Sequence, residues 1–225
     1  MPLKTKIFLS DEGFGHIVRQ EAIVCELKKQ APGLFVEIQT HNYIDTAKGI
    51  INAEKFTDKY NNITWHKQEN GSPDIAKIRD YYSGYLSRCE NFISEENAQN
   101  TEYDFFVSDF VYEAFNIAEI KKIPSFGIAH FTWDWFFSKL YPFPLNSEIL
   151  DYFYKSVNKA NTIYFPPFTP VEILKHFKKN LLEVPLIVRK GVVHKNMSVK
   201  NRFKVLFIDS GAGVLTYKIA KAVQK

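Results

Sequence analysis

Short apolar runs alternate with amphipathic stretches along most of the chain. The apolar runs are rich in β-branched and aromatic residues and have the length of buried strands. They are Lys4–Ser10, Leu34–Thr40, Ile63–His66, Phe105–Ser108, Pro124–Ala129, Thr162–Phe165 and Val184–Val188. Apolar positions at helical spacing predict helices over Ile17–Gln30, Asp74–Ser94, Glu113–Lys121 and Leu145–Ala160. This order predicts an α/β fold, with a Rossmann-like, doubly wound parallel sheet over residues 1–189.

The same pattern starts again near the C-terminus. A polar, basic stretch over residues 190–202 predicts a linker. Phe203–Asp209 then reads as a strand, Gly211 and Gly213 lie in the loop after it, and Leu215–Val223 reads as a helix. We expect residues 203–225 to be the incomplete start of a second α/β domain, because one strand and one helix cannot close a core.

Composition narrows the class of protein. Hydrophobic residues make up 45% of the 225 residues and charged residues 24%, which is typical of a globular protein rather than a disordered one. The sequence has no apolar run of the roughly 18 residues that a membrane-spanning helix needs. Because the first strand follows Met1 almost at once, a signal peptide is not expected and a cytoplasmic location is. Contact with a membrane is expected to be peripheral at most, through the basic stretch Arg189–Lys204.

Several kinds of partner are not expected. Cys25 and Cys89 lack the spacing of metal ligands, so we expect free thiols, no metal site and no disulfide. The net charge of +4 is mild and no stacking motif accompanies it, which argues against binding of nucleic acid.

The loop after the first strand is the most informative segment. Gly13 and Gly15 allow the backbone to approach a ligand, and the helix that follows offers unpaired N–H groups. His16 stands at the start of that helix and could remove a proton from a hydroxyl group. The alternative is a turn that needs glycine, with a solvated histidine cap, and the pattern supports both equally. Val18 takes the place of the third glycine of a dinucleotide fingerprint, which argues against NAD binding.

Two further segments follow strands of the predicted sheet. Asp109 comes directly after Phe105–Ser108, at the same edge of the sheet as His16, where it could hydrogen-bond the imidazole. The alternative is that Asp109 caps the next helix. His130, Thr132, Trp133 and Asp134 follow Pro124–Ala129, where aromatic and polar groups could bind a sugar ring or an apolar acceptor. They could equally be core residues of the next helix.

These segments resemble a known family. A strand followed by Gly-Phe-Gly-His, with Arg19 three residues later, resembles the N-terminal domain of GT-B glycosyltransferases. The likeness is strongest to the glycosyltransferase-like half of plant arabinokinases and weaker to the MurG group. Phe106–Phe110, Ile123–Ser125, Phe131–Phe136 and Val184–Arg189 match further segments of that domain in family order, so the resemblance spans Ile7 to Arg189.

The resemblance implies roles for residues of this chain. It makes the chain the acceptor-binding half of an enzyme that uses a nucleotide sugar, commonly a UDP-sugar, and a hydroxyl acceptor, without a cofactor. His16 would be the general base and Asp109 its orienting partner. The residues implied to contact substrate are Gly13, Phe14, Gly15, Arg19, His130, Thr132, Trp133 and Asp134. Gly211 and Gly213 resemble the glycine loop that opens the donor-binding half.

Two departures from the family pattern qualify these expectations. Asp11 and Glu12 place negative charge near the expected diphosphate, which is unfavourable unless the loop turns them away. Most of the donor-binding half is missing, so we expect little transferase activity from this chain alone, and a second subunit could supply donor binding. The alternatives are a sugar-nucleotide epimerase on the same fold and a non-catalytic sugar-binding or partner-binding module.

Overall fold

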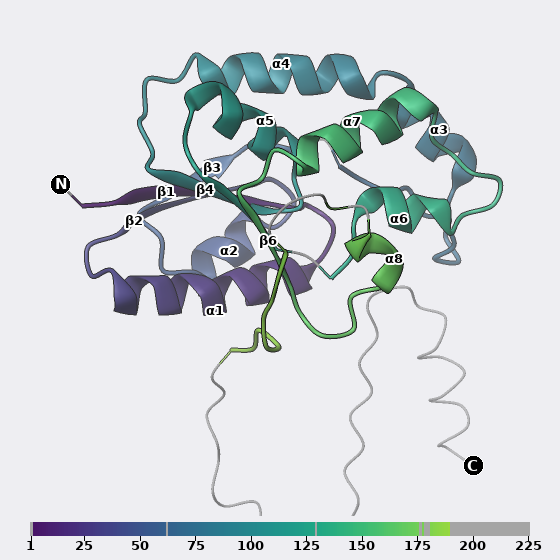
Figure 1. Ribbon diagram of the computed structural model, residues 1–225. Helices are drawn as coiled ribbons and strands as arrows, with labels where there is room; N and C mark the ends of the chain where they lie inside the picture. Colours follow the sequence, from purple (N-terminus) through teal and green to yellow (C-terminus); the bar gives the residue numbers. More distant parts are fainter. Residues whose placement is uncertain (1, 62, 129, 176, 178–180, 190–225) are drawn as a thin grey trace, which may run out of the picture.

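One parallel sheet forms the centre of the molecule. The computed structural model describes residues 2–189 except 62, 129, 176 and 178–180 (Figure 1). In this part of the chain the sheet has seven strands in the order β3-β2-β1-β4-β5-β6-β7, and every neighbouring pair is parallel. The strands are β1 Lys4–Leu9, β2 Phe35–Thr40, β3 Lys55–Asp58, β4 Phe105–Asp109, β5 Ser125–Ile128, β6 Thr162–Phe165 and β7 Leu181–Glu183. The predicted α/β fold class is therefore confirmed.

Helices cover both faces of the sheet, as a doubly wound fold requires. α1 Phe14–Gln30 and α2 Ile44–Ile50 pack on one face (Figure 1). The opposite face carries α3 Ile75–Ser83, α4 Tyr85–Asn97, α5 Tyr112–Lys121 and α7 Ser147–Val157. Two short helices, α6 Trp133–Ser138 and α8 Val171–Leu174, lie near the carboxyl ends of the strands.

The core beneath the second group of helices is aromatic. The rings of Tyr112 and Phe153 stack with centroids 4.2 Å apart, and Tyr85 meets Phe153 edge-on at 5.5 Å. The other face has an aliphatic core between α1 and strands β1 and β2, built on residues such as Val24 and Ile38. Each face therefore buries a continuous apolar layer, which is the main source of stability in such folds.

A buried ion network joins the first strands to α4. The Lys6 ammonium group is fully buried and lies 2.6 Å from Glu96 and 3.2 Å from Glu37. Burial alone would raise the pKa of Glu37, but hydrogen bonds from Lys55 and Tyr103 and the charge of Lys6 lower it to about 2. The network keeps buried charges paired, as burial in an apolar core demands.

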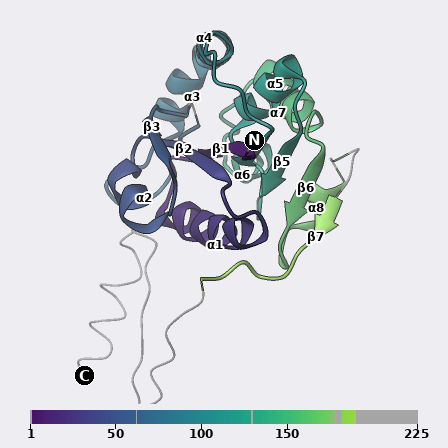
Figure 2. The same cartoon turned by 90° about the vertical axis from the view of Figure 1, so that its left-hand side faces the viewer.

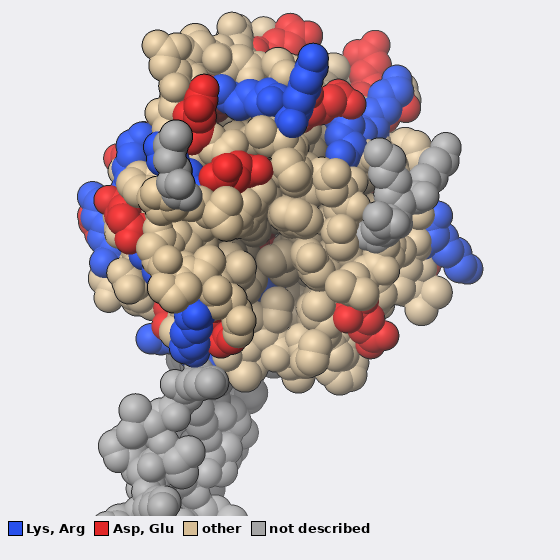
Figure 3. Space-filling model, turned by 60° about the vertical axis from the view of Figure 1, so that its left-hand side comes forward, with Lys and Arg blue, Asp and Glu red and all other residues tan. Residues whose placement is uncertain are grey.

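Among the described residues, α1 and α2 cover only part of their face of the sheet. Figure 2 shows α1 beneath the first strands, while the chain after β7 runs under β5 and β6 towards α1. Residues 184–187 line this side together with side chains of α1 and of the sheet. Seen from the amino ends of the strands, uncharged side chains surround a hollow, and charged residues of both signs lie around its rim (Figure 3).

Some predicted elements are wrong. Ile63–His66 is not a strand, because the third strand is β3 and Ile63 is instead a buried loop residue packed in the aromatic core. Val184–Val188 is not a strand either, since β7 ends at Glu183 and the next residues leave the sheet. The predicted helix Asp74–Ser94 is divided at Gly84 into α3 and α4, and α2 was not predicted.

The predicted linker 190–202, most of the basic stretch Arg189–Lys204 and the predicted strand, glycine loop and helix of 203–225 lie outside the described residues. The predicted domain boundaries thus remain predictions. Within the part of the chain that the structure describes, no helix is long and apolar enough to cross a membrane.

Candidate functional site

The strand order reverses between β1 and β4, and this is where the candidate site lies. The chain leaves β1 towards one side of the sheet and leaves β4 towards the other, so a crevice opens at their carboxyl ends. β1 pairs with β4 in a register that sets Leu9 opposite Asp109. The loop after β1 then leads into α1, whose first turn carries His16. Two residues far apart in the sequence are thereby brought together.

The carboxylate of Asp109 is the centre of the site. It is fully buried, and its Oδ1 atom lies 2.8 Å from Nδ1 of His16, with which it forms a hydrogen bond. Arg19 binds it with two nitrogens, Nη2 to Oδ1 and Nε to Oδ2 at 3.1 Å. The Gln20 amide donates to Oδ2 at 2.9 Å. The hydrogen bond predicted between His16 and Asp109 is therefore present, and three residues of α1 hold the carboxylate in place.

The charge of Asp109 fixes the tautomer of His16. Burial alone would raise the pKa of Asp109, but the charge of Arg19 and the hydrogen bonds from His16 and Arg19 hold it well below its ordinary range. An ionised carboxylate only accepts hydrogen bonds, so Nδ1 of His16 must carry the proton and donate it. The 3.0 Å approach of Arg19 Nη2 to the same Nδ1 is then a packing contact. Nε2 is left as the acceptor of the neutral ring.

A cavity of about 400 Å³ opens beside this cluster. Six of the predicted residues line it, namely Gly15, His16, Arg19, Asp109, His130 and Trp133. Phe131 of the predicted aromatic segment lines it too, as do three residues that the sequence did not single out as site residues, namely Val18, Phe110 and Ile187. Of these three, Phe110 lies beside a predicted residue, whereas Ile187 carries no local signal.

His130 forms part of the cavity wall. Desolvation, followed by the positive charge of Arg19, lowers the pKa of His130. The two histidines of the cavity differ in their contacts, because Nδ1 of His16 lies 2.8 Å from the Asp109 carboxylate, whereas desolvation is the largest influence on the pKa of His130.

Four predicted residues lie outside the walls of this cavity. Gly13 has φ 143°, a conformation that side chains rarely adopt, and it sets the turn into α1. Phe14 is half exposed. Thr132 is buried directly before α6, and its Oγ1 atom finds no partner within the described residues. Asp134 belongs to a different cavity, so these residues shape the surroundings of the site rather than its walls.

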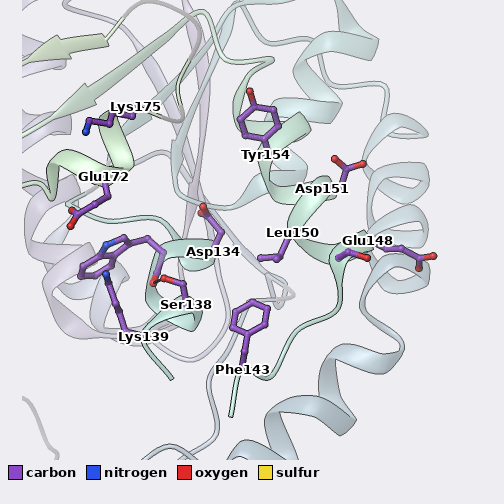
Figure 4. A pocket seen from close by; sticks show the side chains of 12 residues that line it. Asp134, Ser138, Lys139, Phe143, Glu148, Leu150, Asp151, Tyr154, Glu172 and Lys175 are labelled. Carbon is purple, nitrogen blue, oxygen red and sulfur yellow. Dashed lines mark hydrogen bonds between the residues drawn. The ribbon is translucent and has the colours of Figure 1, made fainter. Parts of the chain in front are cut away.

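The second cavity has a volume of about 900 Å³ and lies between α6, α7 and α8 (Figure 4). Asp134 stands at its back, with Lys139 and Glu172 to one side and Glu148 and Asp151 to the other. Its lining is mixed in charge and mostly exposed, and it contains none of the His16 cluster.

The two acidic residues of the loop are turned away from the cavity. Asp11 is buried, and its carboxylate accepts hydrogen bonds from the Thr40 hydroxyl and the His41 amide at 2.7 Å and from the Asn61 amide at 2.8 Å. Glu12 accepts from the Thr64 hydroxyl, and burial raises its pKa. Asp11 thus ties the loops after β1, β2 and β3 together. The unfavourable charge that the sequence suggested is removed from the site.

Comparison with known proteins identifies the fold. No protein-family model matches the chain, and no curated protein matches it in sequence. UGT89C1 of Arabidopsis thaliana superposes with a TM-score of 0.53 at 10% identity, over 85% of this chain and 51% of that one. Its complex with UDP-L-rhamnose gives 0.51 at 10% identity, over 84% and 54%. A UDP-glucosyltransferase from Polygonum tinctorium that glucosylates indoxyl gives 0.50 at 13% identity, over 85% and 54%.

The chain spans about half the length of these solved structures. Identities this low establish a shared fold and nothing finer. The seven-stranded parallel sheet with helices on both faces is therefore a Rossmann-like fold of the GT-B type.

Proposed function

We propose that residues 1–189 form the acceptor-side domain of a GT-B glycosyltransferase, which transfers a sugar from a nucleotide sugar to a hydroxyl group. The observation that carries this proposal is the His16–Asp109 pair at the wall of a cavity, at the point where the strand order reverses. A neutral imidazole held by an ionised carboxylate has the arrangement of a general base.

The proposed reaction forms one bond and breaks another. The acceptor oxygen bonds to the anomeric carbon of the sugar, and the bond from that carbon to the nucleoside diphosphate breaks. The acceptor proton moves to Nε2 of His16. Asp109 stabilises the imidazolium that results, and Arg19 and Gln20 keep Asp109 ionised and oriented. Arg19 lines the cavity, but its guanidinium is bound to Asp109, so we assign it to positioning rather than to substrate.

The donor is proposed to be a UDP-sugar, which agrees with the UDP-L-rhamnose bound in one of the similar structures and with the name UDP-glucosyltransferase of another. Its nucleotide would be held by a second domain, of which Gly211 and Gly213 are the proposed first loop, or by a second subunit. The acceptor would lie against Gly15, His130 and Trp133. We therefore propose that this chain alone transfers little sugar.

A reconstituted transfer assay tests the proposal. The chain would be co-expressed with the product of the reading frame that follows codon 225, and supplied with UDP-sugars and a panel of hydroxyl acceptors. His16→Ala should lower transfer by about 10²–10⁴-fold, the usual contribution of a general base. His41→Ala is the matched control, because His41 also bonds an aspartate at 2.7 Å but is exposed and lies outside the cavity.

Transfer that survives His16→Ala unchanged would contradict the assignment of the base. The alternatives give different readouts in the same assay. An epimerase would convert the UDP-sugar with no acceptor present, and a binding module would leave the UDP-sugar intact under all conditions.

A further inference from the structure

A third cavity, which is apolar and which we call the groove, adjoins the His16 cavity. It has a volume of about 660 Å³, and none of the described residues that line it carries a charge. Ile187 lines both cavities, so the two meet at this residue.

The two cavities follow the same helix. His16 and Arg19 on α1 line the His16 cavity, and Ile23 and Leu27, one and two turns further along, line the groove. The rise of an α-helix places Leu27 about 16 Å along the axis from His16. The floor of the site thus changes from polar to apolar along one helix.

The sheet repeats this change. On β4, Asp109 lines the His16 cavity and Val107 and Phe105 line the groove, as alternate residues of one strand face do. On β5, His130 just beyond the strand lines the His16 cavity, while Ile128 lines the groove. A polar end with a proton acceptor therefore continues into an apolar groove along helix and sheet together.

We infer that the acceptor is a hydroxylated lipid, with its hydroxyl group beside His16 and its hydrocarbon chain in the groove. The inference that this lipid is the acceptor rests on the proposed function. The binding of its hydrocarbon chain in the groove does not depend on catalysis. Continuity with the His16 cavity favours this occupant, because a long molecule with one hydroxyl group at its end would fill both cavities at once. The mostly apolar lining matches a hydrocarbon chain better than a polar acceptor.

A homologous series of alcohols tests the inference on the full 225-residue chain. Binding of n-hexanol, n-octanol and n-decanol would be measured by isothermal titration calorimetry. Each buried methylene contributes about 0.8 kcal/mol, so each pair of added methylenes should tighten the dissociation constant about 15-fold. A gain below about twofold per pair overturns the inference.

Two matched variants locate the binding. Leu186 lines the groove and is 53% exposed, and Ile120 on α5 is 56% exposed on the other side of the sheet. Leu186→Asp should abolish the dependence on chain length, because it places a charge in the groove, and Ile120→Asp should preserve it. Equal effects of the two variants would overturn the assignment to this groove.

The result separates this inference from the proposed function. Retained dependence on chain length with no sugar transfer in the reconstituted assay would leave a lipid site and remove the transferase. Transfer to acceptors with no dependence on chain length would keep the transferase and remove the lipid acceptor.

Discussion

Replacing Asp109 with Asn should destabilise the fold strongly. The carboxylate is fully buried and accepts four hydrogen bonds, one from His16, two from Arg19 and one from Gln20. An amide has one acceptor oxygen, so at least one donor would face the new NH₂ group, and the guanidinium of Arg19, only 10% exposed, would lose its counter-ion. Breaking a buried ion pair on one side costs about 3–5 kcal/mol.

For a domain of this size that cost corresponds to a fall in melting temperature of about 6–20 °C. Thermal unfolding followed by circular dichroism would measure it. Asp58→Asn is the matched control, because Asp58 also bonds a histidine but both side chains are more than half exposed. Water screens such a pair, so this change should have little effect.

A second substitution tests the reason for the loss. Arg19→Met in the Asp109→Asn background removes the uncompensated cation, so the double variant should be more stable than the sum of the two single effects predicts. A melting temperature for Asp109→Asn no lower than that for Asp58→Asn would refute the reasoning. Strict additivity in the double variant would refute the coupling with Arg19.

Three further changes probe the rest of the fold. Lys6→Met removes the buried cation between Glu37 and Glu96, which keep Lys55 and Lys59 as partners, so it should lower stability in urea unfolding by less than the roughly 3–5 kcal/mol of a fully unpaired buried charge; unchanged stability would contradict the paired network. The folded-state pKa of Glu37 is about 2, below its unfolded value, so its contribution is present above pH 4.5 and is lost as the pH falls towards 2. Glu37→Gln should flatten the stability profile over that window, and a parallel profile would show that Glu37 is not responsible. A Cβ at Gly127 would lie 2.6 Å from Ile163 Cδ1, so Gly127→Ala should cost about 1–3 kcal/mol. Gly49→Ala meets no atom within 4 Å and should instead stabilise α2 by about 0.5–1 kcal/mol, and chemical denaturation of both variants checks the difference in sign.

The parts of the fold that depend on local pattern were predictable. β1, the glycine turn and α1 follow from an apolar run, from Gly13 and from helical spacing, all of which are local. Parallel order then predicted that His16 and Asp109 would share one edge of the sheet, and their contact is present. A rule of topology thus linked residues that are 93 positions apart.

The parts that depend on tertiary packing were not predictable. Ile63 resembles a strand residue because it is apolar and β-branched, yet it fills the aromatic core from a loop. Ile187 joins two cavities only because the chain after β7 returns beneath the sheet. Thr132 and Asp134 alternate with cavity residues in sequence, but the start of α6 at Trp133 turns them in other directions. No local signal encodes these placements.

The protonation of His16 is the most direct test of the proposed mechanism, and it needs neither a donor nor a second domain. Spectra of the chain labelled with the heavy nitrogen isotope in histidine, recorded while the rings are neutral and assigned with His16→Asn, would report which ring nitrogen carries the proton. We predict a proton on Nδ1, bonded to Asp109, and an unprotonated Nε2 ready to accept the proton of a hydroxyl group. A proton on Nε2, with Nδ1 accepting from Arg19, would contradict the account, because His16 could not then act as its base.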